Sequence, residues 1–225
     1  MADPASEPAT ASNEPSPLTD LVAMMARLRT DCAWKAAQTH RSLARHLLEE
    51  TYELLDAIES VEPSDAASSS SPAADDEHLR EELGDVLLQV YFHSAIAAEA
   101  GRFDIEDVAR GLMEKLVRRN PHVFGDVHET DPERINATWE AVKADEKQRA
   151  DVLDGIPLEL PALARAAKVV DRLTRSGVTL PSHDPGDRAG ADDLGDRLLE
   201  LVVEANRTGI DPEQALRDAV RRAGG

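Results

Sequence analysis

Two acidic runs, Glu49-Glu50-Thr51-Tyr52-Glu53 and Glu82-Leu83-Gly84-Asp85, decide the fold of this chain. At about 100° per residue, the apolar residues around each run gather on one face of a helix. Glu50 and Glu53 border the apolar face of the first helix on the same flank, and Glu82 lies about 40° from the centre of the second face. A carboxylate left unpaired in such a position is costly. We therefore expect two antiparallel helices that bring the acidic pairs together.

Four carboxylates between two helices suit a hard cation. Glu50, Glu53, Glu82 and Asp85 offer only oxygen atoms, with no His or Cys among them. Mg²⁺ is the expected ion, and Mn²⁺ is its close competitor. The alternative is that each run forms a solvated helix face or a set of ion pairs one turn apart.

Composition favours an all-α protein with one main core and a small appendage. The chain has 225 residues, of which only 3% are aromatic, whereas β-sheet proteins are rich in aromatic and β-branched residues. Its 25 basic and 44 acidic side chains give a net charge of −19. Such a chain should repel nucleic acid. It should also repel a nucleoside triphosphate, so that phosphate chemistry would require a metal and a local group of Lys and Arg.

The single cysteine and the absence of long apolar runs predict a cytoplasmic protein. Cys32 cannot form a disulfide within the chain, which fits a reducing compartment. Residues 1–17 have no basic residue and no signal-like apolar run. No stretch approaches the roughly 20 apolar residues of a membrane span. We expect no membrane partner.

The chain divides into a disordered leader (1–17), a helical domain (18–150) and an extension (151–225). A first helix is expected at 18–29, and the loop after it carries Trp34 as a hydrophobic anchor or a platform for a base. Residues 60–77 predict a flexible connector. The helix expected at 78–100 is apolar on nearly every side, which favours a homo-oligomer.

Basic residues gather at the end of a helix expected at 105–119. Lys115, Arg118 and Arg119 either complement the helix dipole or hold phosphate. A following helix, 132–149, places Trp139 and Lys143 on one face.

The extension predicts helices at 162–175, 192–206 and 212–222. Its Asp193-Leu194-Gly195-Asp196 run repeats the pattern of the second acidic run. We interpret residues 151–225 as a degenerate half-module that packs but does not catalyse.

E-E-x-x-E followed by a spacer and E-x-x-D resembles the metal motif of the all-α nucleoside triphosphate pyrophosphohydrolases, and in particular the MazG branch. Residues 32–39, 101–104, 115–124 and 139–147 are also similar, so the resemblance covers about residues 18–150. It implies an antiparallel helical bundle, a homodimer, and hydrolysis of nucleoside triphosphates for nucleotide-pool sanitation.

The resemblance also implies roles for individual residues. Glu50, Glu53, Glu82 and Asp85 would bind Mg²⁺, with Glu49, Glu50 and Glu53 as the catalytic carboxylates. Glu49 is either a further ligand or orients water. Lys115, Arg118 and Arg119 would contact phosphates, while Trp139, Lys143 and Trp34 would contact the nucleotide.

The chain departs from the usual MazG pattern in three places. Ala33 and Lys35 stand where Pro and Asp are usual, Asn120 stands where His is usual, and the second module is incomplete. Three alternatives stay open. The first is a pyrophosphatase for one nucleotide such as phosphoribosyl-ATP or dUTP, and the second is a non-catalytic module that binds nucleotides or partners. The third, a ferritin-like redox bundle, requires E-x-x-H pairs, which neither Glu50 nor Glu82 begins.

Overall fold

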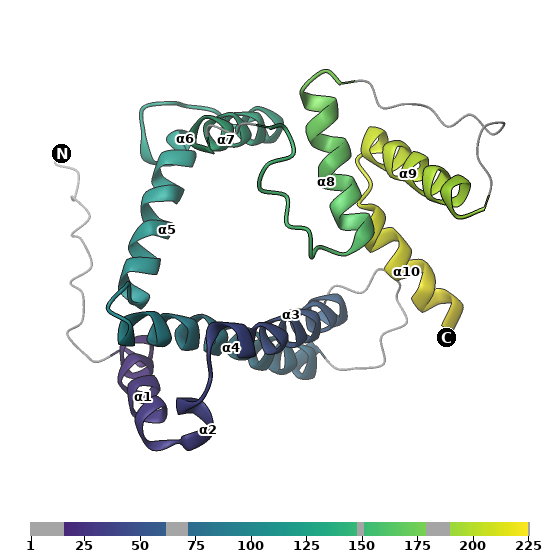
Figure 1. The fold of residues 1–225 in the computed structure, drawn as a ribbon. Coiled ribbons are helices and arrows are strands. Elements are labelled where there is room, and N and C mark those ends of the chain that lie inside the picture. Colours follow the sequence, from purple (N-terminus) through teal and green to yellow (C-terminus); the bar gives the residue numbers. More distant parts are fainter. Residues whose placement is uncertain (1–15, 62–71, 148–150, 179–189, 225) are drawn as a thin grey trace. The chain divides into compact units, whose positions relative to one another are not determined.

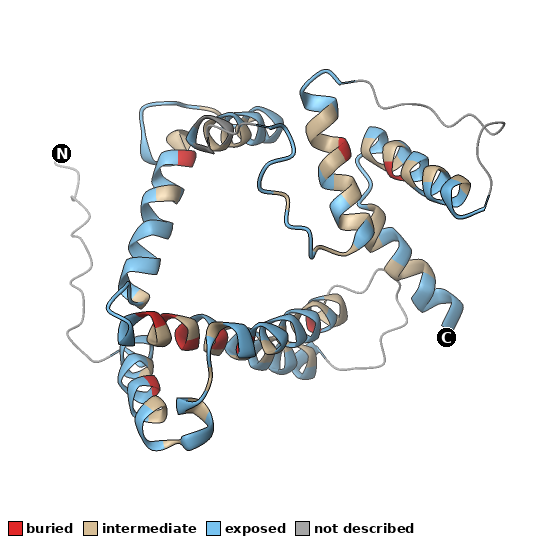
Figure 2. Ribbon diagram, in the orientation of Figure 1, coloured by how far each residue is buried: buried red, intermediate tan, exposed pale blue. Residues whose placement is uncertain are grey.

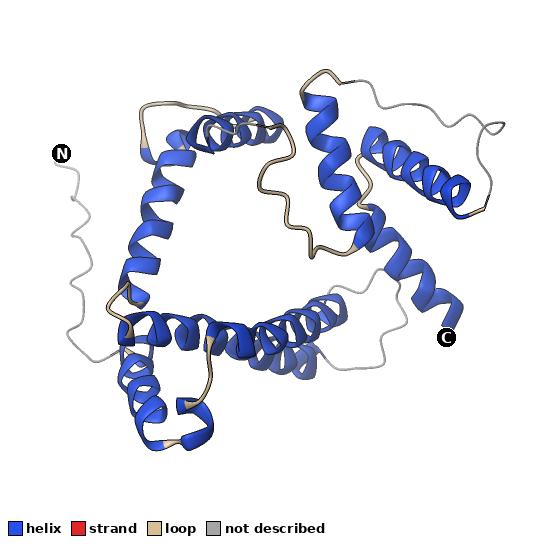
Figure 3. Ribbon diagram, viewed as in Figure 1, coloured by secondary structure: helices blue, strands red, loops and turns tan. Residues whose placement is uncertain are grey.

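A computed structural model describes residues 16–61, 72–147, 151–178 and 190–224 of the chain. In these ranges the protein contains α-helices and no strand (Figure 3), which confirms the all-α fold class. The chain forms two compact units, Met1–His128 and Glu129–Gly225. None of the described helices is long and apolar enough to cross a lipid bilayer. The predicted division at residue 150 stays a prediction.

The N-terminal unit contains a long helical hairpin, and the shorter helices α1, α2 and α5 meet it at one end (Figure 1). Its elements are α1 (Pro17–Asp31), α2 (Ala33–Ala36), α3 (His40–Val61), α4 (Pro72–Glu99), α5 (Ile105–Arg119) and α6 (Pro121–Phe124).

Several of these helices begin at the residues that their capping chemistry predicts. The Ser16 side chain accepts a hydrogen bond from the Leu18 backbone N–H, and Pro17 fills the first helical position. Asp104 and Asp107 form a reciprocal capping box at the start of α5.

The hairpin of α3 and α4 is antiparallel, as expected. His40 at the start of α3 meets His93 near the end of α4, whereas Glu50 meets Glu82 further from those ends. As α3 advances by ten residues, its partner position on α4 moves back by eleven. This register brings the first acidic run opposite the second.

The core of the N-terminal unit lies where α1 packs against the hairpin. Met25, Leu43, Tyr91 and Phe92 are its buried residues. The Tyr91 hydroxyl donates a hydrogen bond of 2.9 Å to the Leu18 carbonyl, so that α1 is joined to α4. Burying a side chain as large as Phe92 contributes roughly 1.5–3 kcal/mol. Partly buried apolar residues surround this core: Leu21, Leu28, Leu87, Leu88, Ala95, Ile96 and Ile105.

Arg29 fixes the turn between α1 and α3. Its guanidinium donates to both carboxylate oxygens of Glu99, at 2.7 and 2.6 Å. The same group donates to the carbonyl oxygens of Ala36 (3.2 Å) and Gln38 (3.1 Å), and also to that of Lys35. A single side chain therefore ties α1, α4 and the segment that leads into α3 together.

Two local expectations differ from the structure. The segment with Trp34, expected as a loop, contains the four-residue helix α2. α4 begins at Pro72 instead of near His78, because Pro at the first position and Asp75 in the first turn both favour a helix start. Residues 62–71, within the predicted connector, and residues 1–15 of the predicted leader lie outside the described residues.

The C-terminal unit contains α7 (Pro132–Lys147), α8 (Ala162–Arg175), α9 (Ala191–Thr208) and α10 (Pro212–Gly224). Val170 of α8 and Val202 of α9 are its fully buried apolar residues among those described. The repeated Asp193–Asp196 run lies in the first half of α9, as the second acidic run lies in the first half of α4. Its interpretation as a degenerate half-module stays a prediction.

Many large apolar residues of the N-terminal unit are exposed, and Figure 2 shows α5 mostly in the colour of exposed residues. α5 is the clearest case, since its apolar residues are exposed along one amphipathic face: Val108, Leu112, Met113, Leu116 and Val117. Met113 alone keeps 67% of its surface accessible.

Candidate active site

Three carboxylates from the two acidic runs meet between α3 and α4. One oxygen each from Glu50, Glu53 and Glu82 lies within 4.8 Å of the others. The Glu82 side chain is only 12% exposed, and its Oε1 lies 3.4 Å from Nε2 of His78. Its second oxygen, Oε2, is buried and has no hydrogen-bond partner among the described residues. A buried oxygen without a donor is costly unless a cation is present.

The electrostatics of this carboxylate cluster also favour a cation. The pKa of Glu50 is raised, first by burial and then by the negative charges of Asp85, Glu53 and Glu82. Three neighbouring acidic groups therefore oppose the ionisation of Glu50. A hard divalent ion would screen them, and an all-oxygen donor set suits Mg²⁺ or Mn²⁺. The residues present thus fit the metal that the sequence predicts.

The remaining acidic candidates lie beside this group. Asp85 is near enough to raise the Glu50 pKa but does not belong to the three-carboxylate cluster. Glu49 is exposed and pairs with His46 at 3.0 Å. The roles of Asp85 as a ligand and of Glu49 as a ligand or water-orienting group stay predictions.

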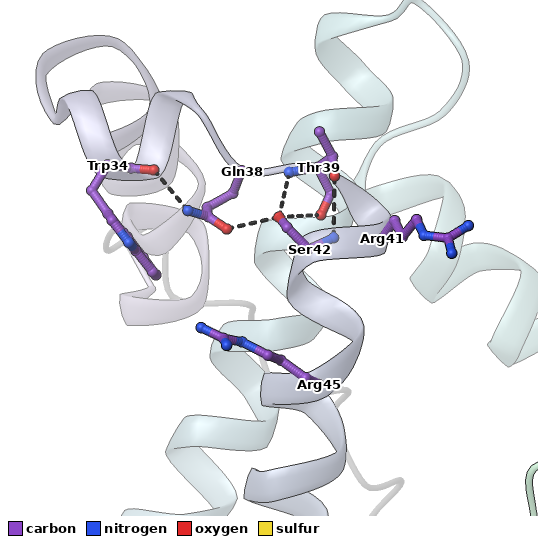
Figure 4. A pocket seen from close by; sticks show the side chains of 6 residues that line it. All are labelled: Trp34, Gln38, Thr39, Arg41, Ser42 and Arg45. Carbon is purple, nitrogen blue, oxygen red and sulfur yellow. Dashed lines mark hydrogen bonds between the residues drawn. The ribbon is translucent and has the colours of Figure 1, made fainter.

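A polar pocket of about 510 Å³ lies beside Trp34 at the start of α3. Its lining residues are Trp34, Gln38, Thr39, Arg41, Ser42 and Arg45. Figure 4 shows the Trp34 ring and the Arg45 guanidinium projecting toward one another from α2 and α3, whereas Arg41 points away. Trp34 is 54% exposed, so it does not serve as a buried anchor. The arrangement offers a flat ring with cations nearby, as base stacking requires.

Hydrogen bonds hold the wall of the pocket in place (Figure 4). The Gln38 amide donates to the Trp34 carbonyl at 3.0 Å and accepts from the Ser42 hydroxyl at 2.7 Å. Thr39 and Ser42 exchange backbone-to-hydroxyl hydrogen bonds of 2.9 and 3.1 Å, which cap the first turn of α3.

The pocket and the carboxylate cluster lie on the same side of α3. Ser42 and Glu53 are eleven residues apart, which places them within about 20° of each other and about 16 Å apart along the helix axis. Between them, the His46 ring meets the Trp34 ring edge-on at 6.2 Å. One extended ligand along α3 could therefore contact both.

The basic residues of α5 lie at the far end of that helix from the core. Ile105 packs against the core, and Lys115 to Arg119 follow ten to fourteen residues later, or about 15–21 Å along the axis. Arg119 is buried, Lys115 is half-buried and Arg118 is exposed. Their contact with phosphate stays a prediction.

Trp139 and Lys143 belong to the C-terminal unit. Lys143 lines a cavity of about 500 Å³ between α7 and α8, together with Lys168, Arg172 and Arg175. Its ammonium group lies 2.8 Å from Glu140, which also pairs with Arg175 at 3.3 Å. Burial favours the neutral form of Glu140, but Lys143 and Arg175 outweigh it and lower the pKa of Glu140. Binding of the nucleotide by Trp139 and Lys143 stays a prediction.

Sequence reasoning missed several polar residues around the Trp34 pocket. Gln38, Ser42 and Arg45 carry no motif of their own, although Gln38 falls inside the segment 32–39 that resembles MazG proteins. Their placement depends on how α2 folds back beside α3, which no local pattern encodes.

Known proteins resemble this chain over most of its length. The MazG nucleotide pyrophosphohydrolase domain matches residues 38–124, which include both acidic runs and most of the pocket. The chain is 45% identical over 219 residues to an uncharacterised 26.1 kDa protein of Streptomyces cacaoi, covering 92% of this chain and 83% of that protein.

Two further relatives carry a functional name. The nucleoside triphosphate pyrophosphohydrolase of Mycobacterium tuberculosis is 43% identical over 205 residues, which are 90% of this chain and 54% of that protein. The nucleoside triphosphate pyrophosphohydrolase/pyrophosphatase MazG of Thermotoga maritima is 37% identical over 225 residues, covering 90% of this chain and 81% of that protein. Because the similarity extends over most of both proteins in the Thermotoga case, the chain belongs to the MazG nucleotide pyrophosphohydrolase family.

Proposed function

We propose that this chain hydrolyses a nucleoside triphosphate to the monophosphate and pyrophosphate. The observation that carries the proposal is the carboxylate cluster of Glu50, Glu53 and Glu82, in which a buried Glu82 oxygen lacks a partner. Two relatives named for this activity support it. A net charge of −19 disfavours binding of a triphosphate unless cations intervene.

Glu50, Glu53 and Glu82 would hold a divalent cation, with Asp85 as a fourth ligand. Mg²⁺ is the expected ion, and Mn²⁺ is its substitute. When bound, the ion would polarise a phosphoryl oxygen and screen charge on the phosphates.

The side chains of this chain would carry the remaining steps. Glu49 or Glu53 accepts a proton from water as the water oxygen forms a bond to the α-phosphorus. The bond between the α-phosphorus and the oxygen that bridges to the β-phosphorus breaks, and its electron pair leaves with pyrophosphate. Lys115, Arg118 and Arg119 stabilise the negative charge on the departing group.

The Trp34 pocket would receive the base. An exposed indole ring opposite the Arg45 guanidinium provides a stacking surface, and the pocket lies on the same side of α3 as the carboxylate cluster. Trp139 and Lys143 would add contacts from the C-terminal unit. Because stacking accepts any base, we expect the enzyme to act on several nucleotides of the pool, as a cytoplasmic sanitation activity would.

The exposed face of α5 supports a homodimer. Its apolar residues face solvent along three turns, and exposed Leu83 and Val90 add apolar surface on α4. A second copy of the chain would bury these faces. Apolar faces of this extent are typical of stable oligomer interfaces.

Phosphorus NMR of the products tests the proposed reaction. A panel of triphosphates is incubated with Mg²⁺ and, separately, with a chelator. We expect metal-dependent monophosphate and pyrophosphate, lost in Glu53→Gln and retained in Glu81→Gln, which replaces an exposed acid outside the carboxylate cluster. Orthophosphate as the first product would contradict the proposal. Nucleotide binding without turnover would indicate a binding module, and turnover of one nucleotide alone would indicate a narrow-substrate pyrophosphatase.

A further inference from the structure

Two histidine rings that meet edge to edge join the start of α3 to α4. Nδ1 of His40 lies 2.7 Å from Nδ1 of His93. The two rings are nearly parallel, with an interplanar angle of 5° and centroids 5.0 Å apart. Arg102, in the segment between α4 and α5, places Nη2 2.6 Å from Nε2 of His40. Three side chains from three segments therefore form one continuous chain of hydrogen bonds.

One arrangement of protons satisfies both contacts. Arg102 can only donate, so Nε2 of His40 must accept and the His40 proton must lie on Nδ1. That proton is donated to Nδ1 of His93, which places the proton of neutral His93 on Nε2. This Nε2 is buried and has no hydrogen-bond partner among the described residues. The chain of hydrogen bonds requires neutral rings at both His40 and His93.

The histidine pair lies directly behind the Trp34 pocket. Thr39 and Ser42, on either side of His40, line the pocket, and Gln38 bonds to the Trp34 carbonyl. On the other side of this turn, Arg29 binds the carbonyl oxygen of Gln38 at 3.1 Å. The pocket wall is thus attached to the rest of the unit through Arg29 and through His40.

We propose that Arg102, His40 and His93 are positioning residues, which fix the first turn of α3 against α4 and thereby hold the Trp34 pocket in its binding shape. Their effect on substrate binding rests on the proposed function, whereas their effect on the position of Trp34 does not. The hydrogen bonds exist only while the rings are neutral. The shape of the pocket should therefore depend on pH.

The surroundings of His93 oppose a second proton. Its pKa is lowered, first by burial and then by His40. The other charged groups nearby are mostly cations: Arg102, Lys35 with Nζ 5.5 Å from the neighbouring Phe92 ring, and Arg29 with Cζ 5.8 Å from that ring. The carboxylate of Glu99, at the end of α4, is engaged by Arg29.

The sign of the pH effect follows from this shift. A histidine whose pKa is lower in the folded chain binds fewer protons there than in the unfolded chain. Its stabilising contribution is complete above the ordinary value of 6.5. It is lost progressively as the pH falls below that value. Acid should therefore loosen the turn and the Trp34 pocket.

The test uses His93→Asn, because an Asn carbonyl can accept from His40 in place of Nδ1 but does not titrate. In ligand-free protein carrying Trp139→Phe, Trp34 is the only tryptophan. His46→Gln in the same background removes the histidine ring that meets Trp34, so the emission of Trp34 and its quenching by acrylamide report the pocket at each pH. We expect a transition below pH 6.5 that is reduced in His93→Asn, where only the contact from Arg102 still needs a neutral His40 ring. It should be retained in the matched control His128→Asn, which replaces an exposed histidine. A transition of undiminished size in His93→Asn, or none in the parent protein, would overturn the proposal.

Kinetics with Trp139 intact separate positioning from a merely structural role. His93→Phe removes the pair and should raise KM about fivefold with kcat retained, the loss expected of one hydrogen bond. His93→Asn should restore KM and flatten its dependence on pH. If His93→Phe does not fold, Arg102→Gln replaces it. Equal losses of kcat in the Phe and Asn variants would refute the positioning role of His93. Absence of turnover in the wild type would instead refute the proposed function, and the fluorescence experiment alone would then test whether the histidine pair holds the Trp34 pocket.

Discussion

Replacing Glu82 with Gln should stabilise the metal-free protein. Oxygens of Glu82, Glu50 and Glu53 lie within 4.8 Å of one another. At this separation two unit charges repel by about 3.5 kcal/mol for an effective dielectric constant of about 20. Exposure of Glu53 and screening by salt reduce the net gain to about 1–2 kcal/mol, or a Tm rise of about 2–8 °C. The lost contact to His78 opposes this weakly, since the His78 side chain is 47% exposed.

The same substitution should abolish the rise in Tm that Mg²⁺ produces in the parent protein. A ligand that binds only the folded state stabilises it by about 2.7 kcal/mol at one hundred times its Kd. Glu82→Gln removes the charge of one of the three clustered carboxylates and replaces one of its two oxygens with an amide nitrogen, which repels a cation. Thermal unfolding followed by circular dichroism, in chelator and in Mg²⁺, measures both effects. Glu81→Gln on the same helix is the matched control. If Glu82→Gln melts with the control in chelator and shows the same rise in Mg²⁺, the assignment of this cluster as a metal site is wrong.

Three further predictions concern the fold and its assembly. Arg29→Lys should lower the free energy of unfolding by about 1–3 kcal/mol, because Lys cannot replace the forked contacts to Glu99 and the backbone carbonyls; urea titration measures this, with exposed Arg27→Lys as the control. The hydrogen bond from Arg29 lowers the pKa of Glu99, so its stabilising contribution is complete above the ordinary value of 4.5 and declines as the pH falls below it. Acid unfolding of Glu99→Gln should show a weaker dependence on pH in that window, and an unchanged profile would contradict the assignment. Leu112→Glu should convert the proposed dimer to a monomer in sedimentation experiments, whereas Arg110→Glu should not; a variant that stays dimeric would exclude α5 from the interface.

Local chemistry predicted most of the helices. Asp104 and the basic end of α5 follow capping and dipole rules, so periodicity and caps gave the start and the end of that helix. The start of α4 was placed late because the residues before His78 are polar and carry no apolar period. The helix propensity of these residues, together with Pro72 and Asp75, determines where α4 begins.

Contacts between distant segments were harder to predict. The meeting of Glu50 and Glu82 could be predicted because each acidic residue borders an apolar stripe, and two such stripes must face each other. The His40–His93 pair spans 53 residues, and neither ring lies in a recognisable pattern. Trp34 had two open interpretations until its exposure excluded a buried anchor.

The spacing of the acidic runs has a consequence for how the chain would acquire the proposed cation. Glu53 and Glu82 are separated by 28 residues, and closing a loop of that size in a disordered chain carries an entropic cost of about 3–4 kcal/mol. Only the formed hairpin brings both runs together without this cost. The unfolded chain is therefore a poor chelator, so that nearly all of the binding energy of the ion adds to the stability of the folded hairpin. An ion at this position would bind folded copies of the chain in preference to unfolded ones. It would reach the proposed catalytic carboxylates only after the two helices have paired.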